Sequence, residues 1–227
     1  MERQGVAVVA AGLGAMGTAL CQRLAQAGFK VAALYGAGEA APAAWQSIQR
    51  DQGWRVTAYP IDLGDYGACE WLVQRILKEQ GGLDVLVQQA AEAAPQPLGA
   101  IGPRDWLQVL RASLDGAYNL GKPALEPMLA QRRGRIVHIV PWDGGAVHGG
   151  AARSGIHGFT KALALEVAKQ GVTVNTVAPG PMGDSGNPVG RPCGVDDVAA
   201  AVAYLVSEEA AYMSGALLPV NGGAHMV

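Results

Sequence analysis

The sequence predicts an α/β fold in which a seven-stranded parallel sheet is doubly wound within one domain, residues 1–227. Three observations support this fold class. Short apolar segments alternate with helical patterns from end to end, the apolar segments lack the polar alternation of half-exposed strands, and 227 residues suit one large domain. Folds of this class bind ligands at the carboxyl ends of their strands.

The first expected strand is residues 5–10, a short, Val-rich run that ends at a glycine-rich loop. Six further apolar runs have the same character, namely residues 30–35, 54–61, 83–90, 134–140, 171–180 and 215–223. Amphipathic spacing predicts helices over 18–28, which ends at a glycine, over 66–82, which ends at two glycines, and over 148–171. A long helical pattern over 103–134 should be interrupted near Pro123 and Pro127.

The composition limits the possible partners and ligands. Half of the residues are hydrophobic and only 16% are charged, so we expect apolar surface to be buried between subunits. A net charge of −2 gives no reason to expect nucleic acid or a membrane as partner. Cys21, Cys69 and Cys193 are far apart in sequence, which predicts single thiols without a metal site. Without a signal peptide or long apolar run, we expect a cytoplasmic protein.

A glycine-rich loop follows the first strand. Gly12, Gly14 and Gly17 form a G-x-G-x-x-G pattern at a strand-to-helix turn, where glycines let the backbone approach a pyrophosphate. The same glycines could instead serve only a tight turn and close helix packing. Asp62 follows the third strand, where it could meet an adenine amino group or cap the next helix. These four residues are the candidate cofactor-binding residues.

Several longer stretches resemble the short-chain dehydrogenase/reductase family, close to its acetoacetyl-CoA and 3-oxoacyl reductase branch. The resemblance rests on GTALCQRLAQAGFKV, LDVLVQQAA, GRIVHIV, SGIHGFTKALALEVAKQGVTVNTVAPG and SEEAAYMSGALLPVNGGAHM, and it covers nearly the whole chain. It implies a Rossmann-type sheet and NAD(P)-dependent chemistry. The family's TGxxxGxG loop, aligned on Gly17, places Ala11 and Ala15 at two of its glycines, so the pattern here is offset.

The resemblance also locates the family's catalytic positions, and this chain lacks the expected side chains there. The YxxxK tyrosine and lysine correspond to Gly149 and Arg153. The catalytic serine falls near Val140–Pro141, and the relay asparagine falls on Ser113. The substrate lid, around residues 183–193, is largely deleted. We therefore expect no catalytic residue and no metal ligand in this chain.

A substitute proton donor would have to come from Asp143, His148 or His138, which lie near the catalytic loop in sequence. His148 is adjacent to the tyrosine position and titrates in the useful pH range. The simpler interpretation is a solvated loop histidine. His157 and Tyr118 are expected to serve in packing or at an interface.

The leading hypothesis is therefore a non-catalytic subunit that pairs with a catalytically active relative, or with itself, in an NAD(P)-dependent hydroxyacyl-CoA-type dehydrogenase or reductase. On this hypothesis the chain itself binds no cofactor. One alternative is an active NAD(P)-dependent oxidoreductase with an atypical proton relay, which would bind NAD or NADP. Another is a protein that senses a dinucleotide or a metabolite.

Overall fold

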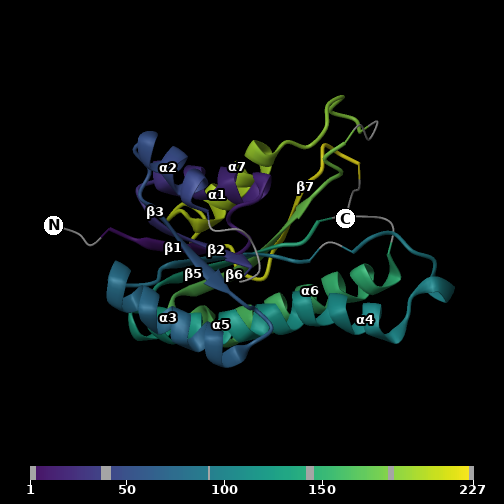
Figure 1. The fold of residues 1–227 in the computed structure, drawn as a ribbon, viewed down its shortest axis with the longest axis horizontal. Helices are drawn as coiled ribbons and strands as arrows, with labels where there is room; N and C mark the ends of the chain where they lie inside the picture. Colours follow the sequence, from purple (N-terminus) through teal and green to yellow (C-terminus); the bar gives the residue numbers. More distant parts are fainter. Residues whose placement is uncertain (1–3, 37–41, 92, 142–145, 184–186, 225–227) are drawn as a thin grey trace.

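The computed structural model describes residues 4–36, 42–91, 93–141, 146–183 and 187–224. Figure 1 shows a central sheet with helices on both faces, as the alternation of apolar and amphipathic segments predicts. The strands are β1 (Val6–Val9), β2 (Lys30–Gly36), β3 (Val56–Ile61), β4 (Val85–Gln89), β5 (Gly134–Ile139), β6 (Val172–Pro179) and β7 (Leu217–Val220). Each lies within, or within one residue of, a predicted strand.

All pairings in the sheet are parallel, and the strand order is β3-β2-β1-β4-β5-β6-β7. The order reverses direction between β1 and β4, where Val8 is in register with Leu86. In such sheets the ligand crevice lies at this reversal, beyond the carboxyl ends of the strands. The predicted fold class is therefore confirmed.

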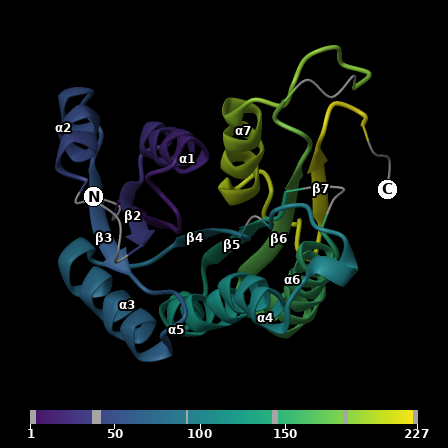
Figure 2. The same cartoon turned by 45° about the vertical axis from the view of Figure 1, so that its right-hand side comes forward.

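Two helical layers cover the sheet, and each closes an apolar core (Figures 1 and 2). One layer contains α1 (Ala15–Gln26), α2 (Ala43–Asp51) and α7 (Val195–Val206); the other contains α3 (Tyr66–Gln80), α4 (Pro103–Leu110), α5 (Gly116–Ala130) and α6 (Val147–Val167). Short helical segments are η1 (Leu98–Ala100), η2 (Arg111–Asp115) and η3 (Ala168–Gln170). Burial on both faces explains why the strands are apolar throughout.

The long helical pattern over 103–134 is interrupted at a different place from the predicted one. Helix α5 continues through Pro123 and Pro127, so the expected break near these prolines is wrong. The irregularity is instead η2, a π-helical turn that joins α4 to α5. Such turns occur frequently at functional sites, and η2 contains Ser113, the residue at the family's asparagine position.

Helix α3 shows why the end signals in the sequence are informative. Asp65 is its N-cap, and the side chain accepts a hydrogen bond from the N–H of Ala68 at 3.1 Å. Gly81 ends the helix in the left-handed conformation with φ of 90°, which favours glycine. The short helix α2, by contrast, was not predicted, because Gln49 is its only buried residue and the apolar signal is weak.

Within the described ranges, no helix combines the length and the apolar character that crossing a bilayer requires.

Candidate functional site

The glycine-rich stretch spans the turn between β1 and α1 and the first residues of α1, beside the reversal of strand order. Two of its glycines are fixed by packing. An ideal Cβ on Gly12 would lie 2.8 Å from the Ala33 Cβ, and one on Gly17 would overlap the Ala11 carbonyl oxygen. Neither position can hold a side chain without movement of its neighbours, so both glycines are explained by the fold alone.

Gly14 differs from the other two glycines. A Cβ on Gly14 would meet no described atom within 4 Å, and the residue is exposed at the N-terminus of α1. Within the part of the chain that the structure describes, no side chain caps this helix, so its first N–H groups are open to an acceptor. Of these three glycines, Gly14 is therefore the one whose lack of a side chain packing does not explain and a bound ligand would explain.

Two alanines flank Gly14 where the related family has glycine. Ala11 has φ of 55°, in the left-handed region that favours glycine, and both Ala11 and Ala15 are exposed. Ala11 thus has a backbone conformation typical of glycine, and Ala11 and Ala15 each add a methyl group to the loop. These methyl groups reduce the space for a phosphate beside the backbone.

Asp62 is exposed just beyond the carboxyl end of β3. Its carboxylate accepts a hydrogen bond from the N–H of Gly64 at 2.8 Å, which forms a tight turn. The alternative assignment of Asp62 as the cap of the next helix is wrong, because Asp65 fills that role. A contact between Asp62 and an adenine stays a prediction.

The position of the family's tyrosine is occupied by another side chain. Gly149 is buried in the first turn of α6, and an ideal Cβ there would lie 3.0 Å from the Ala93 Cβ. The Nη1 atom of Arg153 would lie 3.1 Å from the same Cβ, because the arginine folds back along the helix over Gly149. The guanidinium therefore lies where a tyrosine side chain would begin.

The serine and asparagine positions carry different chemistry. Val140 is 5% exposed and Pro141 has no hydroxyl, so neither of these two residues offers a side-chain donor to a carbonyl oxygen. Ser113 is buried in η2, where its hydroxyl accepts a hydrogen bond from the N–H of Ala91 at 3.2 Å. Its described partner is thus backbone that follows β4.

The histidines are more buried than the sequence suggested. His148 lies within α6 and is 2% exposed, so the expectation of a solvated loop residue is wrong. Its Nδ1 has no hydrogen-bond partner among the described residues. His138 points from β5 to the Thr160 hydroxyl at 2.9 Å, and burial lowers its pKa to about 4, which keeps the imidazole neutral. Asp143 lies outside the described residues.

What remains of the lid packs against the end of the sheet. Asn187 donates to the carbonyl of Arg191 at 2.7 Å, and Val189 donates to Gly222 beyond β7 at 3.2 Å. Arg191 pairs bidentately with Asp197 and, with the N–H of Gly194, lowers the pKa of that carboxyl to about 2. Residues 184–186 of the predicted lid lie outside the described residues. The described part is tied to the β7 side of the site.

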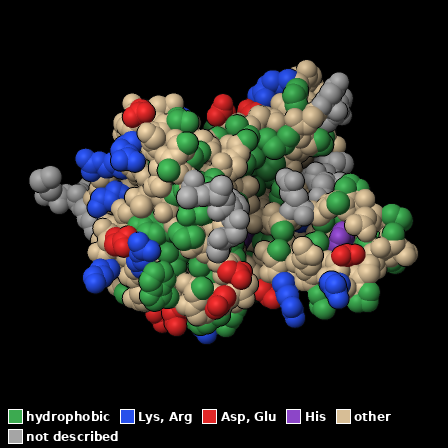
Figure 3. All heavy atoms as spheres, viewed as in Figure 1, with side chains coloured by type: hydrophobic (Ala, Val, Ile, Leu, Met, Phe, Trp, Pro, Cys, Tyr) green, Lys and Arg blue, Asp and Glu red, His purple; other side chains and the backbone are tan. Residues whose placement is uncertain are grey.

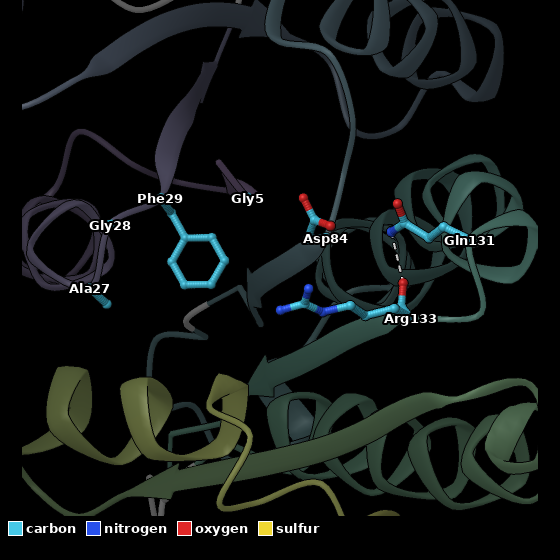
Figure 4. A pocket seen from close by; sticks show the side chains of 7 residues that line it. All are labelled: Gly5, Ala27, Gly28, Phe29, Asp84, Gln131 and Arg133. Carbon is cyan, nitrogen blue, oxygen red and sulfur yellow. Dashed lines mark hydrogen bonds between the residues drawn. The ribbon is translucent and has the colours of Figure 1, made fainter. Parts of the chain in front are cut away.

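A separate hollow of about 480 Å³ opens at the other end of the strands, where β2, β4 and β5 begin (Figure 4). Its lining includes Phe29, Asp84 and Arg133, which directly precede β2, β4 and β5. The Asp84 carboxylate accepts the N–H of Val6 at 2.7 Å, so it holds strand β1 in place. Because this hollow lies at the amino ends of the strands, it is not the crevice of the fold class.

The described residues contain no cluster of acidic, histidine and cysteine side chains able to hold a metal ion. Cys21, Cys69 and Cys193 are buried free thiols, and burial raises the pKa of Cys21 to about 12. A thiol of that pKa is a poor nucleophile. Figure 3 shows charges of both signs interspersed on one face.

Comparison with known proteins adds the family context. The family model described as short chain dehydrogenase matches residues 5–187. The acetoacetyl-CoA reductase of Allochromatium vinosum is 34% identical over 97% of this chain and 98% of that protein. The acetoacetyl-CoA reductase of Cupriavidus necator is 33% identical over 98% and 99%, and the 3-oxoacyl-acyl-carrier-protein reductase of Escherichia coli is 32% identical over 98% of each.

Proposed function

This chain belongs to the short-chain dehydrogenase family, and within it we propose a non-catalytic subunit that pairs with a catalytically active relative. The complex would be an NAD(P)-dependent hydroxyacyl-CoA-type dehydrogenase or reductase. The acyl-CoA setting is suggested by the acetoacetyl-CoA reductases among the relatives.

The arrangement at Gly149 carries this proposal. Proton transfer at a carbonyl needs a positioned acid, and such a group contributes about 10²–10⁴ in rate. A lysine brings a tyrosine into range by favouring its phenolate. Here no phenol is present, and Arg153 fills the space beside Gly149. A guanidinium stays protonated and does not replace the missing acid.

The cofactor site has two ends that differ in their fit to a nicotinamide dinucleotide. At the pyrophosphate end, Gly14 is open but the methyl groups of Ala11 and Ala15 stand beside it. At the reactive end, Gly149 and Pro141 offer neither phenol nor hydroxyl. The residues at that end do not fit hydride-transfer chemistry, and we propose that this chain does not itself use NAD or NADP.

The contribution of such a subunit would be structural. Low charge content leaves apolar residues at the surface, and Leu165 on α6 is 85% exposed. An isologous dimer or a two-plus-two tetramer would bury them. The partner would be a homologous chain that carries the YxxxK pair, or a further copy of this chain.

One observation favours a second candidate, an active oxidoreductase with an atypical relay. His148 is buried next to Gly149 and has one ring nitrogen without a described partner. On this candidate, the imidazole of His148 takes the place of the tyrosine as proton donor. On this alternative, His148→Gln would abolish turnover without changing the fold.

The two candidates separate in one assay. The chain is purified alone and tested with acetoacetyl-CoA, NADH and NADPH, and the oxidation of the reduced nicotinamide is followed by absorbance. The subunit proposal expects no turnover above the blank, and activity only after co-expression with a YxxxK-bearing relative. Turnover by the chain alone at about 1 s⁻¹ or faster, within the ordinary enzyme range, would refute the proposal. Tight dinucleotide binding without turnover would instead support a sensor.

A further inference from the structure

Another hollow, of about 530 Å³, lies where strands β2 and β3 begin. Helices α2 and α3 cover opposite faces of the sheet beside β3 (Figure 2), and their last turns contribute Arg50 and Gln80 to the lining. Strand β2 contributes its first residue, Lys30, and the segment that leads into β3 contributes Trp54 and Arg55. The volume is typical of small-molecule sites, which measure about 300–1,000 Å³. We call this space the basic hollow.

The described lining of the basic hollow is positively charged and contains no acidic side chain. Lys30, Arg50 and Arg55 supply the charge. The other lining residues are uncharged, namely Gln46, Trp54, Val56, Thr57 and Gln80. Among the residues that the structure describes, none of the three cations belongs to an ion pair. Because the whole chain has a net charge of −2, the hollow is a local positive site, and such a site attracts anions.

The two helix ends account for part of this positive charge. The Nζ of Lys30 donates to the carbonyl oxygen of Gln80 at 2.9 Å, and Arg50 lies in the last turn of α2. The carboxyl end of a helix carries about half of a negative charge, so α2 and α3 together offset about one of the three positive charges. Arg55 donates to the side chain of Gln4 at 3.1 Å, and a guanidinium has further N–H donors for an anion. Most of the positive charge is therefore left for a ligand.

Trp54 gives the basic hollow an aromatic wall. Its indole Nε1 donates to the side chain of Gln52 at 3.1 Å, and the residue is only partly buried. The cation–aromatic contacts of the described residues involve Arg75 and Lys122, so no cation of the hollow covers the Trp54 ring. Purine and pyrimidine bases stack on aromatic side chains of this kind. A ligand with both phosphates and a base would use the whole lining.

The edge of β3 argues against an extended peptide as the ligand. β3 is an edge strand of the sheet, and an exposed edge can accept a further strand. The N–H of Ala58 is already donated to the side chain of Gln46 at 3.2 Å, and Pro60 has no N–H. A peptide added along this edge would lack both donors. A small anion in the hollow needs neither of them.

From these observations we propose that the basic hollow binds a nucleoside polyphosphate. Arg50 and Arg55 pair with phosphate oxygens, for which the planar guanidinium is well suited. Lys30 adds a third positive charge, and the base packs on Trp54. The hollow lies at the amino ends of the strands, so it is distinct from the crevice beside Gly14, where a dinucleotide binds in this fold class. Failure of this inference would leave the subunit proposal standing, because this site takes no part in turnover.

The test titrates the full-length chain with ADP, with pyrophosphate and with adenosine, by isothermal calorimetry. ADP should bind more tightly than either of the others, because each of them keeps only one part of the contacts. The double variant R50Q/R55Q should weaken ADP binding by roughly tenfold or more, because it removes two charge-assisted contacts to phosphate. Arg104→Gln removes an equally exposed guanidinium from α4 and should bind ADP as the wild type does.

Two single variants separate the base from the phosphates and the hollow from the crevice. Trp54→Leu should weaken ADP binding and leave pyrophosphate binding unchanged. Gly14→Ala alters the crevice and should change neither. Thermal unfolding shows whether each variant is folded. The proposal is overturned if ADP does not bind, if pyrophosphate or adenosine binds as tightly as ADP, if folded R50Q/R55Q binds ADP as the wild type does, or if Gly14→Ala weakens ADP binding more than R50Q/R55Q does.

Discussion

Substitution of Gly17 by alanine tests whether the glycine loop survives for packing or for ligand binding. The new Cβ would overlap the Ala11 carbonyl oxygen and lie 2.6 Å from the Gly12 Cα, so only backbone atoms could make room. Gly14→Ala is the matched control, because its Cβ would meet no described atom within 4 Å. Each variant adds one methyl group, at the N-cap of α1 for Gly14→Ala and inside the first turn of α1 for Gly17→Ala.

The expected difference follows from these contacts. Overpacking costs about 1–3 kcal/mol, and rigid backbone on the clashing side puts Gly17→Ala near 3 kcal/mol. Alanine's better helix propensity returns about 1 kcal/mol, which leaves a net loss of about 2 kcal/mol. For a domain of this size the Tm should fall by about 4–8 °C. At Gly14, alanine is a weaker N-cap than glycine, which destabilises the folded state, but it also makes the unfolded chain less flexible, which stabilises the folded state. The two effects nearly cancel, so the free energy of unfolding of Gly14→Ala should lie within about 0.5 kcal/mol of the wild type.

Thermal and urea unfolding, followed by circular dichroism, measure both variants against the wild type. If Gly17→Ala unfolds within about 0.5 kcal/mol of Gly14→Ala, the close approach described here is incorrect and the packing explanation fails. If the packing explanation holds, the G-x-G-x-x-G pattern is weak evidence that this chain binds a dinucleotide. Gly14→Ala then becomes the informative variant in a binding titration.

Three further predictions concern the site and its surroundings. Burial lowers the folded-state pKa of His138 to about 4. The contribution of His138 to the free energy of unfolding should therefore be constant above pH 6.5 and fall by roughly 3 kcal/mol as the pH drops towards 4. A His138→Gln variant, measured by urea unfolding, should lack most of this pH dependence. Arg191→Ala should raise the pKa of Asp197 from about 2 towards its ordinary value, but not fully because Gly194 still donates to it, as carboxyl NMR titration would report. The pair Gly149→Tyr with Arg153→Lys should give no reductase turnover, since Pro141 lacks the hydroxyl; measurable turnover would show that the serine position is dispensable.

The strands and most helices could be read from the sequence, because buried parallel strands and amphipathic helices leave strong local patterns. The exceptions have physical reasons. Pro123 and Pro127 favour a break by local geometry, yet the helix is held by burial of its inner face, and Pro123 itself is buried. Helix α2 gives only a weak apolar pattern, because Gln49 is its one fully buried residue. Prediction from local sequence therefore fails where tertiary packing outweighs a residue's own preference, as in α5, and where a helix buries too few apolar residues to show a pattern, as in α2.

The candidate site was only partly predictable. Gly12, Gly14, Gly17 and Asp62 were identified as one cofactor set, but the structure separates two packing glycines from one open glycine and gives Asp62 a turn. The spacing of glycines cannot show this, since the contacts come from β2 and from the loop's own carbonyls. The burial of His148, which is 2% exposed, could likewise not be predicted from the sequence.

The sequence alone determined which chemical groups this chain can bring to its strand ends: no fold can put a phenol at Gly149 or a hydroxyl at Pro141. The sequence also determined the doubly wound sheet, because wholly apolar strands that alternate with amphipathic helices must be covered by helices on both faces. Only the tertiary structure decided that the Arg153 guanidinium lies over Gly149, beside Ala93 from the β4 end. The packing of Gly149 against Ala93 joins segments far apart in the chain, and local sequence patterns contain no record of such a contact.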